Sequence, residues 1–236
     1  MLDLCIPTYN EADIIAESIC TIEKTLQSTS LEWRIILADN GSTDGTIDIV
    51  EALLLPQTHI LAVPQRGKGA AIVAVTQMSN AEIFGFIDAD LSVDPQEIEV
   101  FVRHIEHGDA DIVVGSRLIN TRLVQRNFLR TFSSRLFNIL RRVILGIRVA
   151  DSQCGFKMMN ARGRKILTQC TETGWFMDIE FLYRAELTGL VIQEIPVHWE
   201  EHRFAGHKSK LRIVSDGWEA VLAMTRIRRS ARKFTV

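Results

Sequence analysis

The first half of the chain alternates short apolar runs with stretches in which apolar residues recur every three or four positions. Runs rich in Ile, Leu and Val predict strands, and the periodic stretches predict helices. The predicted strands lie at residues 2–6, 33–39, 59–63, 82–88 and 111–116. The predicted helices lie at residues 11–26, 46–54, 69–78 and 95–107. This order indicates βαβ units on a mostly parallel α/β sheet with helices on both faces.

After Arg117 the alternation stops, and helices and short strands follow in a less regular order. Apolar residues between Phe128 and Ile147 recur at intervals of three and four, which predicts an amphipathic helix. Residues 191–199 predict a strand. Residues 174–186 and 218–224 predict helices, the first of which carries two acidic residues near its start.

Polar residues gather where the predicted strands end, at residues 7–11, 39–46, 65–69, 88–94 and 116–117. Ligands of parallel sheets bind beyond the carboxyl ends of the strands. Asp88 and Asp90 stand one residue apart on such a turn, so both can reach one hard divalent ion while its other positions stay open to water or phosphate oxygens. The simpler alternative is an Asp-rich turn in which Asp94 caps the next helix.

The ends of two further predicted strands carry residues suited to binding a nucleotide. Asp39 closes its strand and is placed to bind a base or ribose, although a capped turn explains the residues 39–46 equally well. Lys68 and Arg66 lie near a helix start, where positive charge favours a phosphate-bearing ligand. The segment around them lacks P-loop spacing, and no GxGxxG follows a strand, which disfavours NAD and FAD.

Composition limits the class of protein. With 236 residues and 47% hydrophobic content, the chain has enough apolar residues for a sizeable core. No run of eighteen or more apolar residues and no signal-peptide pattern occurs, so we expect a cytosolic chain that does not span a membrane. The four cysteines lie in apolar contexts and predict buried reduced thiols. His198 and His202 are four residues apart, but the predicted strand at 191–199 takes the place of the helix that would align them, which disfavours zinc.

Residues 116–149 contain eight arginines and no acidic residue, although the whole chain carries a formal charge of −2. One interpretation is a helix packed on the sheet with a solvated basic flank. The other is an amphipathic helix that faces an anionic membrane surface, supported by five more basic residues in 226–233. Binding to nucleic acid is disfavoured because interleaved aromatics and a known motif are missing.

The segments IPTYNE, DNGSTDGT, RGKGAA, DADLSVDP, GSR, DSQCGFKMM and GWFMDIEFLYRA occur in the order found in family 2 glycosyltransferases of the GT-A fold. The chain most resembles dolichyl- or polyprenyl-phosphate glucosyltransferases and mannosyltransferases. This resemblance implies one GT-A domain over residues 1–236. Its nucleotide-sugar part spans about 1–117, and its acceptor and membrane-facing part spans about 118–236.

The resemblance also implies roles for individual residues. Asp88 and Asp90 match the metal-binding DxD, which holds Mg²⁺ or Mn²⁺ against the donor diphosphate. Ser92 stands where many relatives have Gln as a further ligand, so a water is expected to take that contact. The residues matched to the nucleotide are Pro7, Tyr9, Glu11, Asp39, Lys68 and Ala89. The residues matched to acceptor, sugar or catalysis are Arg117, Arg130, Ser134, Asp151, Gln153, Asp178 and Glu180.

The implied reaction is the inverting transfer of a hexose from UDP-glucose or GDP-mannose to polyprenyl or dolichyl phosphate, at the cytoplasmic face of a membrane. A phosphate acceptor is already ionised near neutral pH, so it needs no protein base. Two alternatives remain. A hydroxyl acceptor would require a carboxylate base, for which Asp178 or Asp151 is the candidate. A catalytically silent nucleotide-sugar-binding module is disfavoured by the intact DxD.

Overall fold

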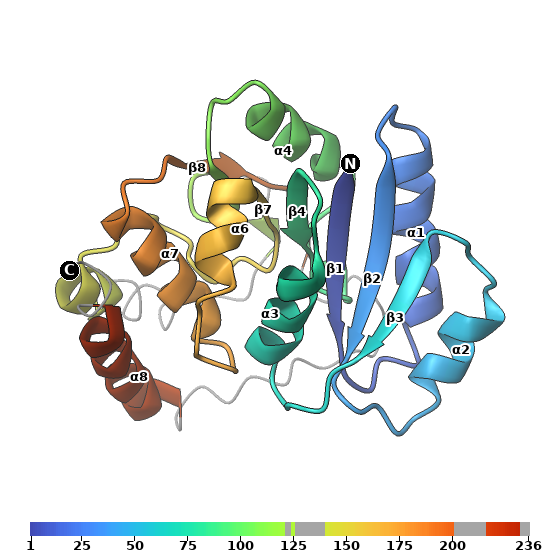
Figure 1. The fold of residues 1–236 in the computed structure, drawn as a ribbon, viewed down its shortest axis with the longest axis horizontal. Helices are drawn as coiled ribbons and strands as arrows, with labels where there is room; N and C mark the ends of the chain where they lie inside the picture. Colours follow the sequence, from blue (N-terminus) through green and yellow to red (C-terminus); the bar gives the residue numbers. More distant parts are fainter. Residues whose placement is uncertain (121–123, 126–139, 201–215, 232–236) are drawn as a thin grey trace.

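A computed structural model of the chain describes residues 1–120, 124–125, 140–200 and 216–231. Its main sheet has seven strands in the order β3-β2-β1-β4-β7-β5-β8, and a second pair is formed by β6 and β9 (Figure 1). The strands are β1 (Leu2–Thr8), β2 (Trp33–Asp39), β3 (Thr58–Ala62), β4 (Ile83–Phe86), β5 (Ile112–Ser116), β6 (Val124–Gln125), β7 (Lys157–Asn160), β8 (Ile192–Pro196) and β9 (Trp199–Glu200). The helices with defined bounds are α1 (Ile15–Gln27), α2 (Thr46–Ala52), α3 (Lys68–Met78), α4 (Glu97–Glu106), α6 (Ala161–Leu167), α7 (Met177–Leu187) and α8 (Asp216–Ala231).

The inner strands of the sheet are buried on both faces, which explains why β1, β4 and β5 are mostly apolar. Along β1, Cys5 packs into one core cluster, whereas Leu4 and Ile6 pack into the other. The first cluster lies under α3, α6, α7 and α8. The second lies under α1, α2 and α4. The fold is therefore a three-layer α/β arrangement with a mostly parallel sheet, as predicted.

One strand runs against the others. β7 pairs antiparallel with both β4 and β5, so that Lys157 lies opposite Phe86 on one side and Val114 on the other. Because β7 runs in the opposite direction, its first residues lie at the edge where β4 and β5 end. The segment just before β7 is thus brought beside Asp88.

The predicted boundaries agree with the structure in most of the first half, and β2 coincides with its prediction. The first helix is an exception, because α1 begins at Ile15 instead of residue 11. The backbone N–H groups of Glu11 and Ala12 donate to the side chains of Thr46 and Asp44, so this stretch belongs to the strand-end loops. Helix α6 was not predicted. The Asn160 side chain caps it by accepting from two backbone N–H groups.

In the second half, β8, α7 and α8 occupy the predicted segments. Of the helix predicted from Phe128 to Ile147, residues 126–139 lie outside the described residues, and residues 140–145 are helical. Among the described residues, no helix combines the length and apolar character needed to cross a bilayer. Cys5, Cys154 and Cys170 are buried, but the prediction was wrong for Cys20, which is exposed on α1.

Candidate active site

The carboxyl ends of β1, β2, β3 and β4 lie at one edge of the sheet, at the bottom of Figure 1. These ends carry the predicted nucleotide and metal residues Tyr9, Asp39 and Asp88, and α3 begins there with Lys68. Strand order therefore gathers residues that are up to 80 positions apart in sequence into one site, as parallel topology predicts.

Asp39 organises the loop after β2. Its carboxylate accepts from the backbone N–H of Gly41 at 3.0 Å and from the hydroxyl of Ser42 at 2.5 Å. Asn10, after β1, accepts from the Thr43 N–H at 2.8 Å and holds the neighbouring loop against this one. Asp39 thus holds a hydrogen-bonded turn, but the predicted helix cap is absent from the N-cap position of α2, which is Gly45 and makes no side-chain capping hydrogen bond. The role of Asp39 toward a nucleotide remains a prediction.

Asn40 was not singled out from the sequence, yet it joins two loops. Its side-chain N–H₂ donates to the carbonyl of Gln65 at 2.9 Å, and its side-chain oxygen accepts from the Gly67 N–H at 3.0 Å. These bonds fix the chain immediately before α3. Because α3 starts with Lys68, Asn40 indirectly fixes the backbone position of that lysine.

Lys68 reaches across to the DxD. Its Nζ lies 2.5 Å from Oδ1 of Asp88, and it also lies 5.1 Å from the ring centroid of Trp175. Burial alone would lower the pKa of the Lys68 ammonium, but the carboxylates of Asp88, Asp178 and Asp90 outweigh it and raise this pKa above its usual value. Lys68 is therefore a cation held in a cluster of carboxylates.

The DxD carboxylates fit a divalent ion. Asp88 and Asp90 are both partly exposed, and Asp88 already binds a cationic group. Asp90 accepts from the Ser92 N–H at 3.0 Å, which fixes the turn between them. Among the described residues, no cluster of three or more His, Cys, Asp or Glu side chains forms a complete metal site. A metal here would thus depend on oxygen ligands from the substrate or from water.

Gly155 forms the wall behind Asp88. A Cβ atom at position 155 would lie 1.8 Å from Oδ2 of Asp88, so any larger residue would displace this carboxylate. The requirement comes from the DSQCGFK segment, which the antiparallel β7 brings to this edge of the sheet. The contact gives a structural reason for glycine in that motif.

Arg117 forms a bidentate ion pair with Asp151. Its Nε and Nη2 donate to the two carboxylate oxygens at 2.7 Å each, and its backbone N–H donates at 2.9 Å. The Glu194 carboxylate accepts from the backbone N–H groups of Ala150 and Asp151, which orients Asp151. Burial opposes the charge on Arg117, but the attraction of Asp151, and to a smaller extent of Asp88, raises the pKa of the guanidinium.

Asp178 and Glu180 lie at the start of α7, as predicted, but both are buried. Lys157 Nζ donates to Asp178 Oδ1 at 2.5 Å and to the carbonyl of Cys154 at 2.7 Å. Glu180 accepts from the backbone N–H of Thr171 and Glu172 and from the Arg184 guanidinium. These contacts order the loop 171–176, and the sugar-binding roles of both acids remain predictions.

The other predicted residues are distributed as follows. Pro7 lies in β1, Tyr9 is exposed just beyond it, and Ala89 is buried with its carbonyl accepting from the Ser18 hydroxyl at 2.6 Å. Gln153 lies in the turn before β7. Arg130, Ser134 and His202 lie outside the described residues. His198 lies 2.7 Å from a carboxylate oxygen of Glu97.

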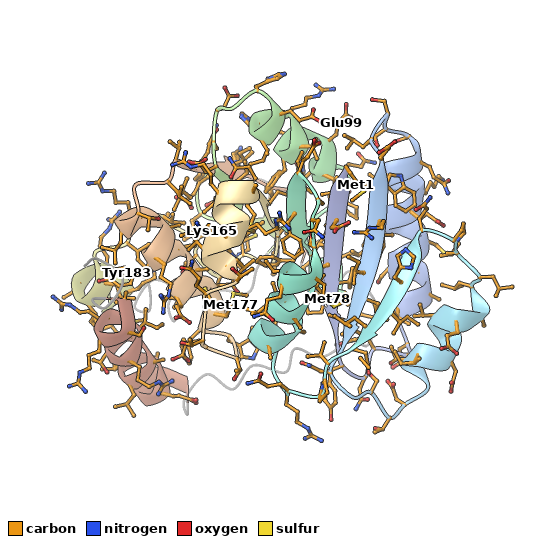
Figure 2. The ribbon with its side chains drawn as sticks, in the orientation of Figure 1. Met1, Met78, Glu99, Lys165, Met177 and Tyr183 are labelled. Atoms are coloured by element: carbon orange, nitrogen blue, oxygen red, sulfur yellow. The ribbon has the colours of Figure 1, made fainter. Side chains whose placement is uncertain are left out.

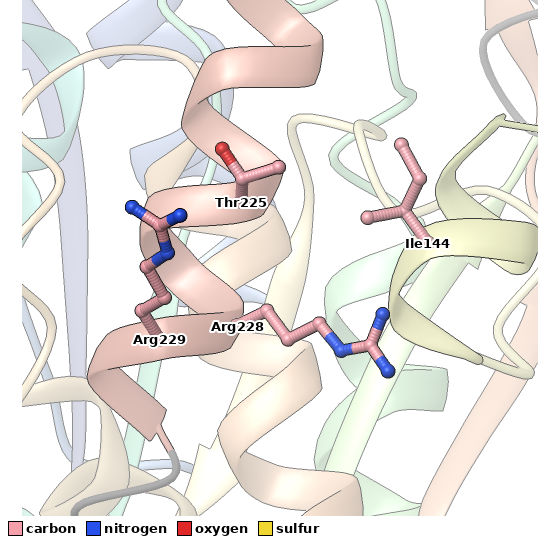
Figure 3. A pocket seen from close by; sticks show the side chains of 4 residues that line it. All are labelled: Ile144, Thr225, Arg228 and Arg229. Carbon is pink, nitrogen blue, oxygen red and sulfur yellow. The ribbon is translucent and has the colours of Figure 1, made fainter.

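A separate cavity of about 270 Å³ lies between residues 140–145 and α8 (Figure 3). It is lined by Ile144, Thr225, Arg228 and Arg229. Figure 3 shows two guanidinium groups from α8 and the apolar side chain of Ile144 around it. None of these residues was predicted to bind the nucleotide sugar.

A family model for glycosyl transferase family 2 matches residues 3–165, which include the DxD, Lys68 and the Arg117–Asp151 pair. The chain belongs to glycosyl transferase family 2. It is 30% identical over 205 residues to glycosyltransferase AglD of Haloferax volcanii, covering 84% of this chain and 33% of AglD. It is also 30% identical over 217 residues to a dolichyl-phosphate beta-glucosyltransferase of Dictyostelium discoideum, covering 85% of this chain and 66% of that protein.

Family 2 membership agrees with the fold. Glucosyl-3-phosphoglycerate synthase of Mycobacterium tuberculosis, solved with Mn²⁺, UDP-glucose and phosphoglyceric acid, superposes with a TM-score of 0.71 at 20% identity. The match covers 97% of this chain and 80% of that one. The chain therefore has the GT-A fold that its motifs resemble. It spans about a third of AglD and about two thirds of the Dictyostelium relative.

Proposed function

We propose that this family 2 chain transfers a hexose, with inversion, from a nucleotide sugar to polyprenyl or dolichyl phosphate. The observation that carries the proposal is the pairing of opposite charges at one sheet edge, where the DxD and Lys68 lie near Arg117. The Dictyostelium relative, a dolichyl-phosphate beta-glucosyltransferase, supports this choice of acceptor and favours UDP-glucose as donor. Residues 1–236 act as one domain, since β7 joins the two parts in a single sheet.

On the donor side, Asp88 and Asp90 would hold Mg²⁺ or Mn²⁺. The bound ion supplies positive charge that stabilises the departing diphosphate. Lys68 adds a second positive charge beside the same site. The loops held by Asp39 and Asn40 form the remaining wall on which a base and ribose would lie.

On the acceptor side, the residues have to attract an anion toward an already anionic donor. Arg117 is held in place by Asp151 and supplies this positive charge. By resemblance, Arg130 adds a second positive charge and Ser134 a hydroxyl donor. Because a phosphate monoester has a second pKa of about 6, it is ionised at neutral pH and attacks without a protein base. The environment of Asp178 agrees with a mechanism that uses no protein base, since its Oδ1 already accepts a hydrogen bond from Lys157.

The membrane is the proposed meeting place of enzyme and lipid. Arg228, Arg229 and the exposed Val143 lie on or near the cavity between residues 140–145 and α8. Basic groups next to apolar ones suit an anionic leaflet, at the cytoplasmic face where nucleotide sugars are available. This surface supports peripheral attachment of the domain.

A transfer assay with UDP-glucose and GDP-mannose as donors tests the proposal. Polyprenyl phosphate is compared with the corresponding polyprenol, with Mg²⁺, Mn²⁺ or EDTA. We expect transfer to the phosphate alone, dependent on metal and reduced by orders of magnitude in Asp88→Ala and Asp90→Ala. Transfer to the alcohol would favour the hydroxyl-acceptor alternative, and full activity of both variants in EDTA would exclude the metal role.

A further inference from the structure

Lys68 binds one of the carboxylates that the proposed metal requires. Its Nζ lies 2.5 Å from Oδ1 of Asp88, the Lys68 side chain is 10% exposed, and that of Asp88 is 35% exposed. An ammonium at this distance occupies one direction from which a divalent ion would approach the same oxygen. Two cations would then compete for one ligand.

The backbone around Lys68 is fixed, so only its side chain is free to change position. Gly67 and Gly69 pack against the backbone of residues 172–174, where a Cβ at either position would lie within 2.6 Å of a carbonyl oxygen. The Ala70 N–H donates to the Thr173 carbonyl at 2.9 Å. Met177, labelled in Figure 2, also lies against Gly69, where an added Cβ would be 2.6 Å from the Met177 Cβ. These contacts hold the start of α3 and the loop 171–176 together.

The Asp88 carboxylate lies directly against Gly155, where an added Cβ would be 1.8 Å from Oδ2. The lysine ammonium, in contrast, has a second favourable environment. Its Nζ lies 5.1 Å from the centroid of the Trp175 ring, and Trp175 is 45% exposed. An aromatic face stabilises a cation without binding it in a fixed direction.

We propose that Lys68 acts as a built-in cation for Asp88, which a divalent metal displaces toward Trp175 and the donor diphosphate. The inference rests on the proposed metal-dependent transfer and adds to it how the binding of metal depends on the nucleotide. Metal alone binds weakly, because it has to displace the Lys68 ammonium and is then repelled by this nearby positive charge. A nucleotide diphosphate relieves this repulsion, since its oxygens accept from the displaced ammonium. Metal and nucleotide therefore each raise the affinity for the other.

Binding of Mn²⁺ in the absence of nucleotide tests this directly, with the electron paramagnetic resonance signal of free Mn²⁺ as the measurement. Lys68→Met removes the competing cation and should bind Mn²⁺ about tenfold more tightly than the wild type, as expected for loss of one adjacent charge. Lys68→Arg keeps a cation and should stay close to the wild type. Lys165→Met removes the same charge from an exposed position on α6 and serves as the control (Figure 2).

Tryptophan fluorescence gives a second measurement. Adding Mn²⁺ to the wild type should change the emission of Trp175, identified by its loss in Trp175→Phe, whereas Lys68→Met should lack this change. Far-UV circular dichroism checks that each variant is folded. If Lys68→Met does not fold, Lys68→Gln is used as the neutral variant in its place. Equal or weaker Mn²⁺ affinity in the folded neutral variant overturns the inference and leaves the proposed transfer intact. Failure of the wild type to bind Mn²⁺ even with nucleotide sugar would instead contradict the proposed function.

Discussion

Lys157 and Asp178 form an ion pair closed to solvent, with Nζ 2.5 Å from Oδ1 and side chains that are 0% and 3% exposed. The two residues come from β7 and α7, so the pair joins an inner strand of the sheet to the helix that follows the loop 171–176. Lys157 also donates to the carbonyl of Cys154, next to Gly155. The pair thus supports both sides of the site around Asp88.

Removing one partner of this pair should destabilise the fold strongly. Lys157→Met leaves the Asp178 carboxylate buried without its cation, which typically costs about 3–5 kcal/mol. The double variant Lys157→Met/Asp178→Leu should recover much of the loss, because neither charge remains. Urea unfolding followed by circular dichroism measures both, with Lys165→Met as the exposed control. A single variant as stable as the control would contradict the predicted role of the pair.

Glycine at position 155 should be required for metal-dependent transfer. Gly155→Ala places a methyl group against Oδ2 of Asp88, so this carboxylate has to move away from its position beside Asp90. We expect turnover to fall by about 10²-fold, in the range for displaced catalytic groups. Gly174→Ala is the matched control, since nothing lies within 4 Å of its added methyl group. Comparable activity of the two variants would show that Asp88 tolerates the displacement.

The cavity at α8 should contribute to membrane attachment. Arg228→Ala/Arg229→Ala removes two cations from its wall, an effect of about 2 kcal/mol that corresponds to roughly 30-fold weaker binding to anionic vesicles. Co-sedimentation at low salt measures it, and rising salt should weaken wild-type binding as well. Arg103→Ala/Lys165→Ala removes two exposed cations elsewhere. If both double variants bound equally well, the basic cavity would not be the attachment surface.

Asp111 should make stability depend on pH. Burial tends to raise the pKa of its carboxyl, but hydrogen bonds from Asn160 and the Val191 N–H, together with Arg162, lower it below its ordinary value of 3.8. The ionised form is therefore favoured by folding, so its contribution is complete above this value and is lost as the pH falls through the lower folded pKa.

We expect Asp111→Asn to lower the free energy of unfolding at neutral pH by about 1–2 kcal/mol, because a charged acceptor is replaced. The difference from the wild type should shrink below about pH 4. Chemical unfolding of both proteins between pH 7 and pH 3 measures this. A difference that stays constant over the range would show that the charge of Asp111 is not the cause.

The sequence predicted the donor half of the site well, and the reason is topological. Asp39 closes a largely apolar strand and Asp88 follows another, and parallel strands place such ends together without further information. Lys157 carried no comparable signal. A charged residue beginning a four-residue strand resembles a surface position, and its burial depends on Asp178, 21 residues later in the chain. Asn40 and Gly155 were missed because their roles arise from contacts between loops.

The antiparallel strand β7 has a consequence for how the protein is made. It lies between β4 and β5 and contributes the pairing that both need, although it is the seventh of the nine strands in chain order. Until residues 157–160 leave the ribosome, β4 has one unpaired edge and β5 has two, because its other partner β8 is made later still. Another chain can join such edges. Folding thus has to insert β7 between β4 and β5 late, by pairing segments distant in sequence, which is a slow step. A nascent chain that stops before β7 is predicted to need protection from self-association.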